Sequence, residues 1–494
     1  MITLIHNPQD SFAAEIVYKA LIRSFAKNQV RKTTFDTIQT QELGVYFLIN
    51  PKNISLQQFP KKSKIILLGK IDADLAVELD IELSSSEKPH DYFTENAIIH
   101  FHSIDQFQFP MTARPFIRYD FPNEWNNLGF GAIKTDDSIW SIAQIAQSHT
   151  AIATISENKT TSVYITFHDF SDQSCVWINR PVGLVDSVNW CFIEYFVSAH
   201  RFDTLISYAY LLDIPAGVNA AVSMRLDCDE DILSAKPLFE AYQNLNVPFS
   251  LAIKTSLPTT ELDKDFLHCI KNSGGAILSH SVNHKVSWGI DYHDAFTEAQ
   301  QSKITLENHF EIVPLQFAVS PFHSNTTYSV NALEDAGYDG FIGGIIANDP
   351  EYLMARGGAI PFAEKIISHS QQCMLHGDCL LSESDPLRIY KKAFDHAYTS
   401  KTFFGYLDHP FSPRYQYGWI TEEQRITAHI DFIQYMRSCT DVLFVNESQC
   451  LQFMIDKSNA EIHYDALNEP KICLNAEKQS EFSVAVSLNH KVFS

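Results

Sequence analysis

The sequence lacks the features that would place the protein in a membrane or on a nucleic acid. No stretch approaches the roughly 18 consecutive apolar residues of a membrane-spanning helix. The first residues, MITLIHNPQDSFAAEIV, contain neither a basic segment nor a long apolar one, so we expect no secretory signal. Lysine and arginine number 37 against 59 aspartates and glutamates, which gives a net charge of −22. Because like charges repel, nucleic acid and anionic lipid are not expected as partners.

Patterns of cysteine and glycine that mark other protein classes are also missing. The nine cysteines are odd in number and scattered, with no C-x-x-C pair. This usage predicts reduced thiols and a cytoplasmic protein. The chain has no G-x-G-x-x-G motif and no Walker lysine, so nothing in it indicates a nucleotide-binding loop.

The length of 494 residues exceeds one ordinary hydrophobic core, and the patterning predicts an α/β protein of four parts. Residues 1–110 alternate apolar strands with helical segments, which predicts a small α/β domain. Residues 111–215 are rich in aromatic and β-branched residues and predict a β-rich segment that ends in a helix. Residues 216–455 carry a repeated strand–helix pattern, and residues 456–494 predict a short β appendage.

The strand–helix pattern of residues 216–455 is typical of an irregular (β/α)7-type barrel, whose site would lie at the carboxyl ends of its strands. The strand candidates are AVSMRLD, PFSLAI, GAILSH, LQFAVS, GFIGGI, CMLHGD, FFGYLD and VLFVN. The helix candidates are residues 231–245, 261–272, 292–310, 327–336, 386–399 and 421–437. Thr421 with Gln424 predicts a capping box at the start of the last helix.

Four side chains at predicted strand ends have the chemistry of a metal site. Asp227 and Asp229 end the first strand, and His280 and His284 follow the third. Two imidazoles and one carboxylate suit zinc and leave a position open for water. The other carboxylate is then available as a general base, and a late histidine as the acid for a leaving amine. The candidates for that acid are His409 and His376.

These motifs resemble those of the polysaccharide deacetylase superfamily (NodB homology, carbohydrate esterase family 4). The segments RLDCDED, VPFSLAI, SHSVNH, VSPFHSN and LDHP occur in the family's order, over roughly residues 216–455. The resemblance implies that Asp227 is the base, that Asp229, His280 and His284 bind the metal, and that His409 is the acid.

The chain departs from the family's pattern at two places. Cys228 separates two acids that are adjacent in most members, and Val319 stands where the family has an arginine that orients the base. Arg225 and Arg414 are candidates to replace that arginine. The family's D-x-x-D-W motif has no clear counterpart, with Asp378 and Asp408 as weak substitutes, and Asp231 is a further carboxylate beside the first motif.

We therefore expect a zinc-dependent hydrolase that removes an acetyl or other small acyl group from an N-acylated sugar. A cytoplasmic location favours a nucleotide-linked or lipid-linked precursor of a surface polysaccharide such as an O-antigen. One alternative is a hydrolase of non-sugar amides on the same barrel. Another is a catalytically inactive protein that binds a glycan or scaffolds other enzymes.

Overall fold

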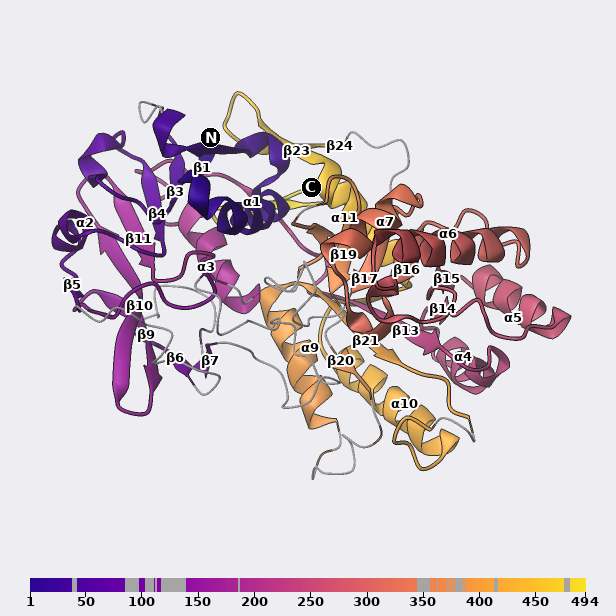
Figure 1. Ribbon diagram of the computed structural model, residues 1–494. Coiled ribbons are helices and arrows are strands. Elements are labelled where there is room, and N and C mark those ends of the chain that lie inside the picture. Colours follow the sequence, from indigo (N-terminus) through magenta and orange to yellow (C-terminus); the bar gives the residue numbers. More distant parts are fainter. Residues whose placement is uncertain are drawn as a thin grey trace.

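The computed structural model contains two large β-sheets with helices packed against them, side by side in Figure 1. It describes residues 1–37, 42–84, 97–102, 111, 113–116, 139–184, 187–343, 356–361, 363–370, 373–375, 377, 385, 387–412, 416–474 and 480–494. No helix in these ranges is long and apolar enough to cross a bilayer.

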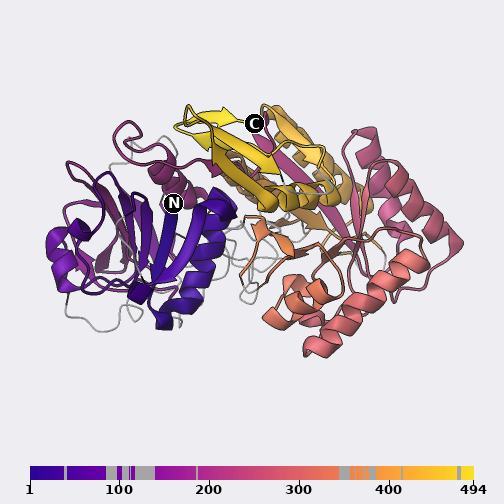
Figure 2. The ribbon, with the colours of Figure 1, turned by 90° about the horizontal axis from the view of Figure 1, so that it is seen from above.

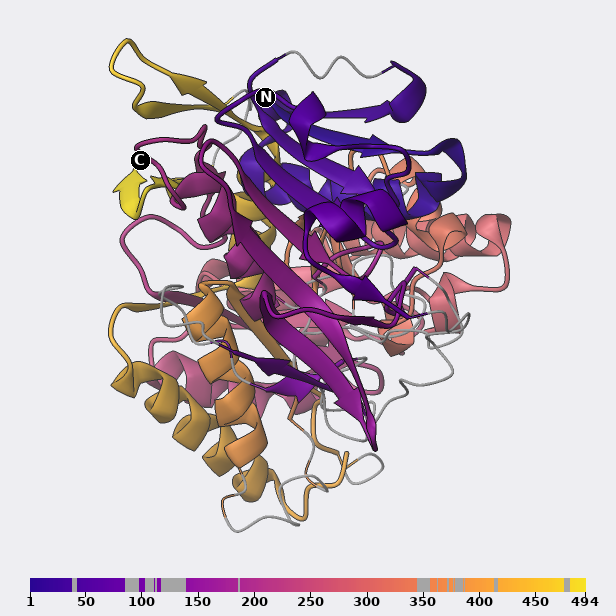
Figure 3. The same ribbon diagram turned by 90° about the vertical axis from the view of Figure 1, so that its left-hand side faces the viewer.

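The first sheet has nine strands, in the order β2-β1-β3-β4-β11-β10-β9-β6-β7 (Figure 3). Their bounds are β1 Ile2–His6, β2 Val30–Thr34, β3 Val45–Ile49, β4 Lys64–Leu68, β6 Ile98–Phe101, β7 Arg114–Pro115, β9 Ala151–Glu157, β10 Thr160–Asp169 and β11 Ser174–Ile178. The pairings from β2 to β11 are parallel, and those from β11 to β7 are antiparallel.

This sheet joins strands from the two N-terminal segments that the sequence divides near residue 110. The joint is the parallel pairing of β4 with β11, in which Ser174 lies opposite Lys64 and Ile178 opposite Leu68. All residues of both strands are buried, so the joint lies in the middle of the sheet. The sequence of a buried apolar strand does not indicate which strand it pairs with, so this pairing is known only from the structure.

Helices cover both faces of the first sheet because its strands place alternate residues on opposite sides. Ile2 and Leu4 face helices α1 (Ser11–Phe25) and α3 (Ser187–Ser198), whereas Ile5 faces helix α2 (Ala73–Glu78). The apolar positions of residues 11–25 recur at helical spacing, and the buried ones include Ile16, Val17 and Leu21.

The second sheet has the order β18-β19-β17-β16-β15-β14-β13-β21-β20, and β22 also pairs with β13. The bounds are β13 Ala220–Cys228, β14 Ser250–Ile253, β15 Ala276–Ser279, β16 Phe317–Val319, β17 Gly340–Gly343, β18 Gly358–Ala359, β19 Ile367–Ser370, β20 Cys373–Met374, β21 Phe403–Asp408 and β22 Val442–Val445. All pairings except that of β18 are parallel. The domain is thus α/β with a large parallel sheet. Because no pairing among the described strands joins β18 to β20, closure into a (β/α)7 barrel stays a prediction.

Two sets of helices pack against the two faces of this sheet. One face carries α4 Lys236–Asn244, α5 Glu261–Asn272, α6 Tyr292–Asn308, α7 Thr327–Asp335, α9 Arg388–Ser400 and α10 Glu422–Ser438. The opposite face packs against α11 (Glu447–Asn459) and is here called the α11 face. Small residues such as Ala221, Ala252 and Ala276 lie on the α11 face and leave room for a helix backbone to approach.

Helix α11 is a feature that the sequence reasoning did not name. Asn446 caps its first turn by accepting a hydrogen bond from the Gln449 amide, and Gln449 caps Asn446 in return. The predicted boundary at residue 455 lies inside this helix. The capping box predicted at Thr421 forms only in part, since Thr421 accepts from Gln424 but the Gln424 side chain accepts from the Ile420 amide.

The C-terminal residues join the part of the molecule built on the first sheet to the part built on the second sheet (Figure 2). These two parts are here called the two halves. Strands β23 (Ala460–Tyr464) and β24 (Pro470–Leu474) form a hairpin, and β25 (Val486–Leu488) pairs with β26 (Lys491–Phe493) and with β12 (Tyr210–Leu211). Asn28 exchanges two hydrogen bonds with Ile462, and the Tyr464 hydroxyl donates to Gln29. The predicted β appendage is therefore anchored on the N-terminal part of the chain.

Buried ion pairs add to this junction. The Arg356 guanidinium lies 2.6 Å from Glu194 of α3 and 2.7 Å from Asp213, and Lys457 of α11 also pairs with Asp213. Ser24 of α1 donates to Glu194. A buried pair of this kind is costly to break, by about 3–5 kcal/mol when one partner is removed, so it defines how the two halves meet.

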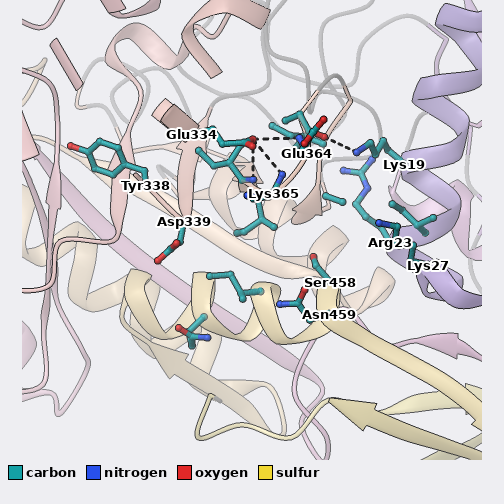
Figure 4. Close-up of a pocket in the computed structure, with 18 of the residues that line it drawn as sticks. Lys19, Arg23, Lys27, Glu334, Tyr338, Asp339, Glu364, Lys365, Ser458 and Asn459 are labelled. Atoms are coloured by element: carbon teal, nitrogen blue, oxygen red, sulfur yellow. Dashed lines mark hydrogen bonds between the residues drawn. The ribbon is translucent and has the colours of Figure 1, made fainter. Parts of the chain in front are cut away.

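A cavity of 1220 Å³ also lies at the junction, between α1 and the amino ends of β16, β17 and β19 (Figure 4). Three of its charged side chains hold the walls together. Lys19 donates to the Ala363 carbonyl, Arg23 donates to the Arg356 carbonyl, and Glu334 accepts from three consecutive backbone amides. This cavity lies at the strand edge opposite to the one that carries the predicted metal ligands.

Candidate metal centre and catalytic residues

The two acids of the first motif lie on the same side of β13. Residues alternate along this strand, so Arg225 and Asp227 face the α11 side while Cys228 packs among the helices on the other face. Asp229 follows the strand end and returns to the side of Asp227. Burial raises the pKa of the Cys228 thiol well above its usual value. The inserted cysteine therefore separates the acids in sequence without acting as a ligand between them.

Asp229, His280 and His284 surround a common point. Asp229 Oδ1 lies 3.5 Å from His280 Nε2 and 3.6 Å from His284 Nε2. These distances are too long for hydrogen bonds but close to the edge of about 3.4 Å expected between ligands of a tetrahedral zinc ion. Asp229 Oδ1 and His280 Nε2 are both buried and have no hydrogen-bond partner in the part of the chain that the structure describes. The donor set and its orphaned atoms fit a divalent metal.

The register of the sheet explains why residues some 50 positions apart meet. Cys228 lies opposite Ile253, and Ile253 lies opposite Ser279, so β13, β14 and β15 end at one level. The residues that follow β13 and β15 therefore emerge side by side. His280 Nδ1 lies 3.0 Å from the Val319 carbonyl of β16, which leaves its Nε2 lone pair directed at the site. Val319 thus orients the His280 ring through its backbone.

The second histidine is held by a tight loop rather than by a helix. Ser281 and His284 have φ angles of 63° and 57°, and the Ser281 hydroxyl accepts a hydrogen bond from the His284 amide at 2.8 Å. This hydrogen bond fixes the turn between the two histidines. Glu298 of α6 accepts from the amides of Val282 and Asn283 at 3.0 and 2.7 Å. Because burial also lowers the pKa of His284 to about 4, its imidazole is neutral and able to bind a cation.

Glu298 provides a test of how far this loop determines metal affinity. In Glu298→Gln an amide nitrogen replaces one of the oxygens that accept from the loop, so we expect zinc to bind about 10- to 100-fold more weakly. Glu307→Gln is the matched control, since Glu307 accepts a backbone hydrogen bond at the far end of the same helix. Competition with a chelating dye measures both affinities. Equal affinities in the two variants would show that the loop holds its shape without Glu298.

Asp227 is bound by the arginine that precedes it by two residues. Arg225 donates from Nε to Asp227 Oδ1 at 2.7 Å and from Nη2 to Oδ2 at 3.1 Å, and both side chains are buried. Burial opposes ionisation of Asp227, but the guanidinium and the nearby His280 and His409 outweigh it and hold the pKa well below its usual range. Of the two candidates to orient Asp227, the structure places Arg225 on it.

His409 follows β21 and faces the same site. Strand β21 pairs with β13 so that Asp408 lies opposite Leu226, which brings the next residue beside the acids. His409 Nε2 lies 3.8 Å from Asp229 Oδ2, and its ring stacks on Tyr417 with centroids 3.9 Å apart. Burial lowers the pKa of His409, against the opposing effect of the carboxylates of Asp229 and Asp227.

Asp408 supports His409 through its backbone and not through its ring. Asp408 Oδ1 accepts from the His409 amide at 2.8 Å and from Trp419 Nε1 at 3.3 Å, while Oδ2 lies 3.0 Å from His429 Nε2. Arg425 donates to the His409 carbonyl. Asp408 is thus a buried anchor of the strand end, and it does not reach His409 Nδ1, which has no hydrogen-bond partner among the described residues.

Three aromatic side chains near the site were not singled out from the sequence. Tyr417 has its hydroxyl 3.5 Å from Asp229 Oδ2. Phe322 has its ring centroid 4.5 Å from that of His284, and the side chain is 53% exposed. His323 is affected electrostatically by Arg225 and Asp227, and burial lowers its pKa to about 3. The segment VSPFHSN was quoted as a motif, but its spacing alone did not reveal that His323 faces the acids.

The remaining candidates lie outside the described residues or away from the acids. His376, Asp378 and Arg414 fall outside the described ranges. Asp231 is exposed and accepts a hydrogen bond from the Leu233 amide at 3.1 Å, which gives it a local capping role.

Comparison with solved structures finds remote likenesses. Agd3, a carbohydrate deacetylase, matches with 10% identity and a TM-score of 0.37 over 99% of this chain and 91% of its own. A family 4 acetyl xylan esterase from Clostridium thermocellum, solved with a cobalt ion, matches with 14% identity and a TM-score of 0.33 over 48% of this chain and 95% of its own. Puue allantoinase matches with 13% identity and a TM-score of 0.35 over 49% of this chain and 91% of its own.

Polysaccharide deacetylases and family 4 carbohydrate esterases recur among these structures, and they are the superfamily that the sequence motifs resemble. No family model matches the chain, and no curated protein matches it. Since the identities and TM-scores are low, we base the function on the geometry of the site.

Proposed function

We propose that the chain is a metal-dependent hydrolase that removes an acetyl or other small acyl group from an N-acylated sugar. The observation that supports this most strongly is the position of Asp229 Oδ1, 3.5 and 3.6 Å from the Nε2 atoms of His280 and His284. A second carboxylate and a third histidine face the same point. These side chains provide ligands for a metal, a general base and a general acid, and hydrolysis of an amide requires all three.

The proposed metal ligands are Asp229, His280 and His284, and zinc is the ion that suits two imidazoles and one carboxylate best. Such an ion would polarise the acyl oxygen and lower the pKa of a water molecule. Asp227 is unsuited to be the third ligand, because Arg225 already binds both of its oxygens. This favours Asp229 as the ligand and Asp227 as the base.

Asp227 would accept the proton of the attacking water, and the Arg225 guanidinium keeps its carboxylate ionised and oriented. His409 would donate a proton to the nitrogen as the carbon–nitrogen bond breaks. The water oxygen then ends in the carboxylic acid product, and the nitrogen leaves as a free amine. The Tyr417 ring, stacked on His409, fixes the plane of the imidazole against rotation.

Phe322 provides a surface for the substrate beside these groups. Its ring is exposed and adjoins His284, at the edge of the site. Its backbone φ angle of 55° is unusual for a bulky residue, which shows that the surrounding structure holds the backbone at this position. A flat apolar surface next to a polar centre suits the apolar face of a sugar ring.

The sugar would be carried on a nucleotide or a lipid, as in the precursors of surface polysaccharides such as O-antigen. Support for this comes from composition, since nine cysteines without a C-x-x-C pair favour a reducing compartment, where such precursors are assembled. An intracellular enzyme would meet the precursor and not the finished polymer.

Acetate release tests the proposal directly. The zinc-loaded protein is incubated with UDP-linked N-acetyl sugars and, in parallel, with simple N-acetyl amides that lack a sugar. We expect release from a sugar substrate and none after treatment with a strong chelator. Turnover of the simple amides alone would assign the chain to the non-sugar amide hydrolases. Metal binding without turnover of either set would favour a glycan-binding protein.

A further inference from the structure

A second group of potential metal ligands lies between β19 and α11. His369 is on β19, and Glu447 and Cys450 are three residues apart on the first turn of α11. One ligand atom of each residue lies within 4.8 Å of those of the other two. All three residues are 1% exposed or less, so the group lies inside the protein.

The buried imidazole of this group is not satisfied by the part of the protein that the structure describes. Neither ring nitrogen of His369 has a hydrogen-bond partner there, while the Glu447 carboxylate lies beside the Ser223 hydroxyl. A buried polar atom left in this state costs about 1–3 kcal/mol, and more when the group is charged. A buried imidazole with both nitrogens in this state is unusual in a packed core, and the carboxylate and thiol beside it indicate that something else occupies the point between the three side chains.

We propose that His369, Glu447 and Cys450 bind a buried zinc ion and leave one coordination position for a water molecule. Imidazole nitrogen, thiolate sulfur and carboxylate oxygen are the three ligand types that zinc accepts in proteins. Binding requires Cys450 to lose its thiol proton to solvent. The thiolate and the carboxylate then balance the two positive charges of the ion, so the completed centre is neutral and suited to a buried position.

The proposed ion is separate from the catalytic centre. Val445, two residues before Glu447, lies opposite Ser223 of β13, whereas the catalytic base is Asp227 on the same strand. Four residues of strand correspond to about 13 Å. Arg225 projects between the two levels, and its charge acts on both Glu447 and Asp227. The inference concerns residues that the proposed hydrolysis does not use, and it does not depend on that function.

The ion would fasten α11 to the sheet. Strand β19 and helix α11 already pack through Ile367 and Met454, but they come from distant parts of the chain. A ligand from the strand and two from the helix would hold the helix terminus against the strand. Because Lys457 of the same helix joins the buried ion pairs at the domain junction, the centre would also stabilise the contact between the two halves.

Cobalt substitution tests this in the unaltered protein. The metal-free chain is titrated with Co²⁺, and near-ultraviolet absorption is recorded for the charge-transfer band that only a thiolate ligand produces. The catalytic centre contains no cysteine among its proposed ligands, so the band reports the second centre alone. We expect the band in the wild-type chain and in His280→Ala plus His284→Ala, and we expect it to be absent in Cys450→Ser.

The matched control is Cys175→Ser, because Cys175 is a fully buried cysteine in the first sheet. It should keep the band. Metal analysis should find two equivalents of zinc in the wild-type chain and one in Cys450→Ser. A wild-type chain that binds cobalt without a thiolate band would overturn the second centre while leaving the catalytic one intact. If the thiolate band appears but His280→Ala plus His284→Ala contains as much metal as the wild-type chain, the catalytic centre alone is contradicted.

Discussion

Replacing Asp227 with asparagine is expected to lower kcat/KM by about 10²- to 10⁴-fold while the chain keeps its catalytic metal. The amide cannot accept the proton of the attacking water, but the metal ligands are untouched. Activity on the sugar substrate identified above and zinc content per chain are measured on the same preparation. A large loss of zinc together with activity would show that Asp227 is a ligand.

Asp229→Asn should behave differently, with loss of both zinc and activity. Its Oδ1 is the carboxylate atom that both imidazoles face, and a neutral amide oxygen binds zinc far more weakly than a carboxylate. Asp231→Asn is the matched control from the same segment, since that side chain is exposed, and it should change neither quantity. If the first two variants exchanged their behaviour, the roles of the two acids would be exchanged as well.

Removing both histidines in His280→Ala plus His284→Ala should abolish binding at the catalytic centre and lower activity by at least about 10³-fold. The magnitude follows because a catalytic metal supplies several kcal/mol of transition-state stabilisation, and each 1.4 kcal/mol corresponds to a factor of ten. Isothermal titration with zinc of the metal-free protein measures the loss. With the second centre intact, one binding event should remain.

A control for this variant is His463→Ala plus His490→Ala, because His463 is exposed on β23 and His490 is exposed in the turn between β25 and β26. It should retain both binding events and full activity. Catalytic zinc binding that persists without His280 and His284 would refute the assignment of the centre. The thermal unfolding midpoints of the variants show whether any loss reflects unfolding of the chain.

Much of the candidate site was predictable because it follows strand ends. Apolar runs followed by Asp227 and by His280 predicted parallel strands, and parallel strands bring their carboxyl ends to one edge. Arg225 was a candidate to orient Asp227 for the same reason, since residues two apart share a face of a strand. These inferences needed only the period of a strand and the order of the motifs.

The same reasoning could not predict the side chains of the site that do not follow a predicted strand. His323 ends a 3-10 helix of three residues and Tyr417 lies in a turn, and such short segments have no period that relates a residue to its neighbours in space. His369 lies on a strand of four residues, ISHS, with too little apolar character to be recognised. Helix α11 was missed because its apolar residues follow β22 directly, and the apparent boundary at residue 455 divided it.

The sequence by itself determined the alternation of strands and helices, the order of the motifs and the chemical types of the catalytic candidates, because each depends on neighbours along the chain. The tertiary structure alone decided which strands pair. It joined β4 to β11 across more than a hundred residues and placed α11 against β19. It also set the distances among Asp229, His280 and His284. Such contacts depend on register and packing between distant segments, and no local pattern records them.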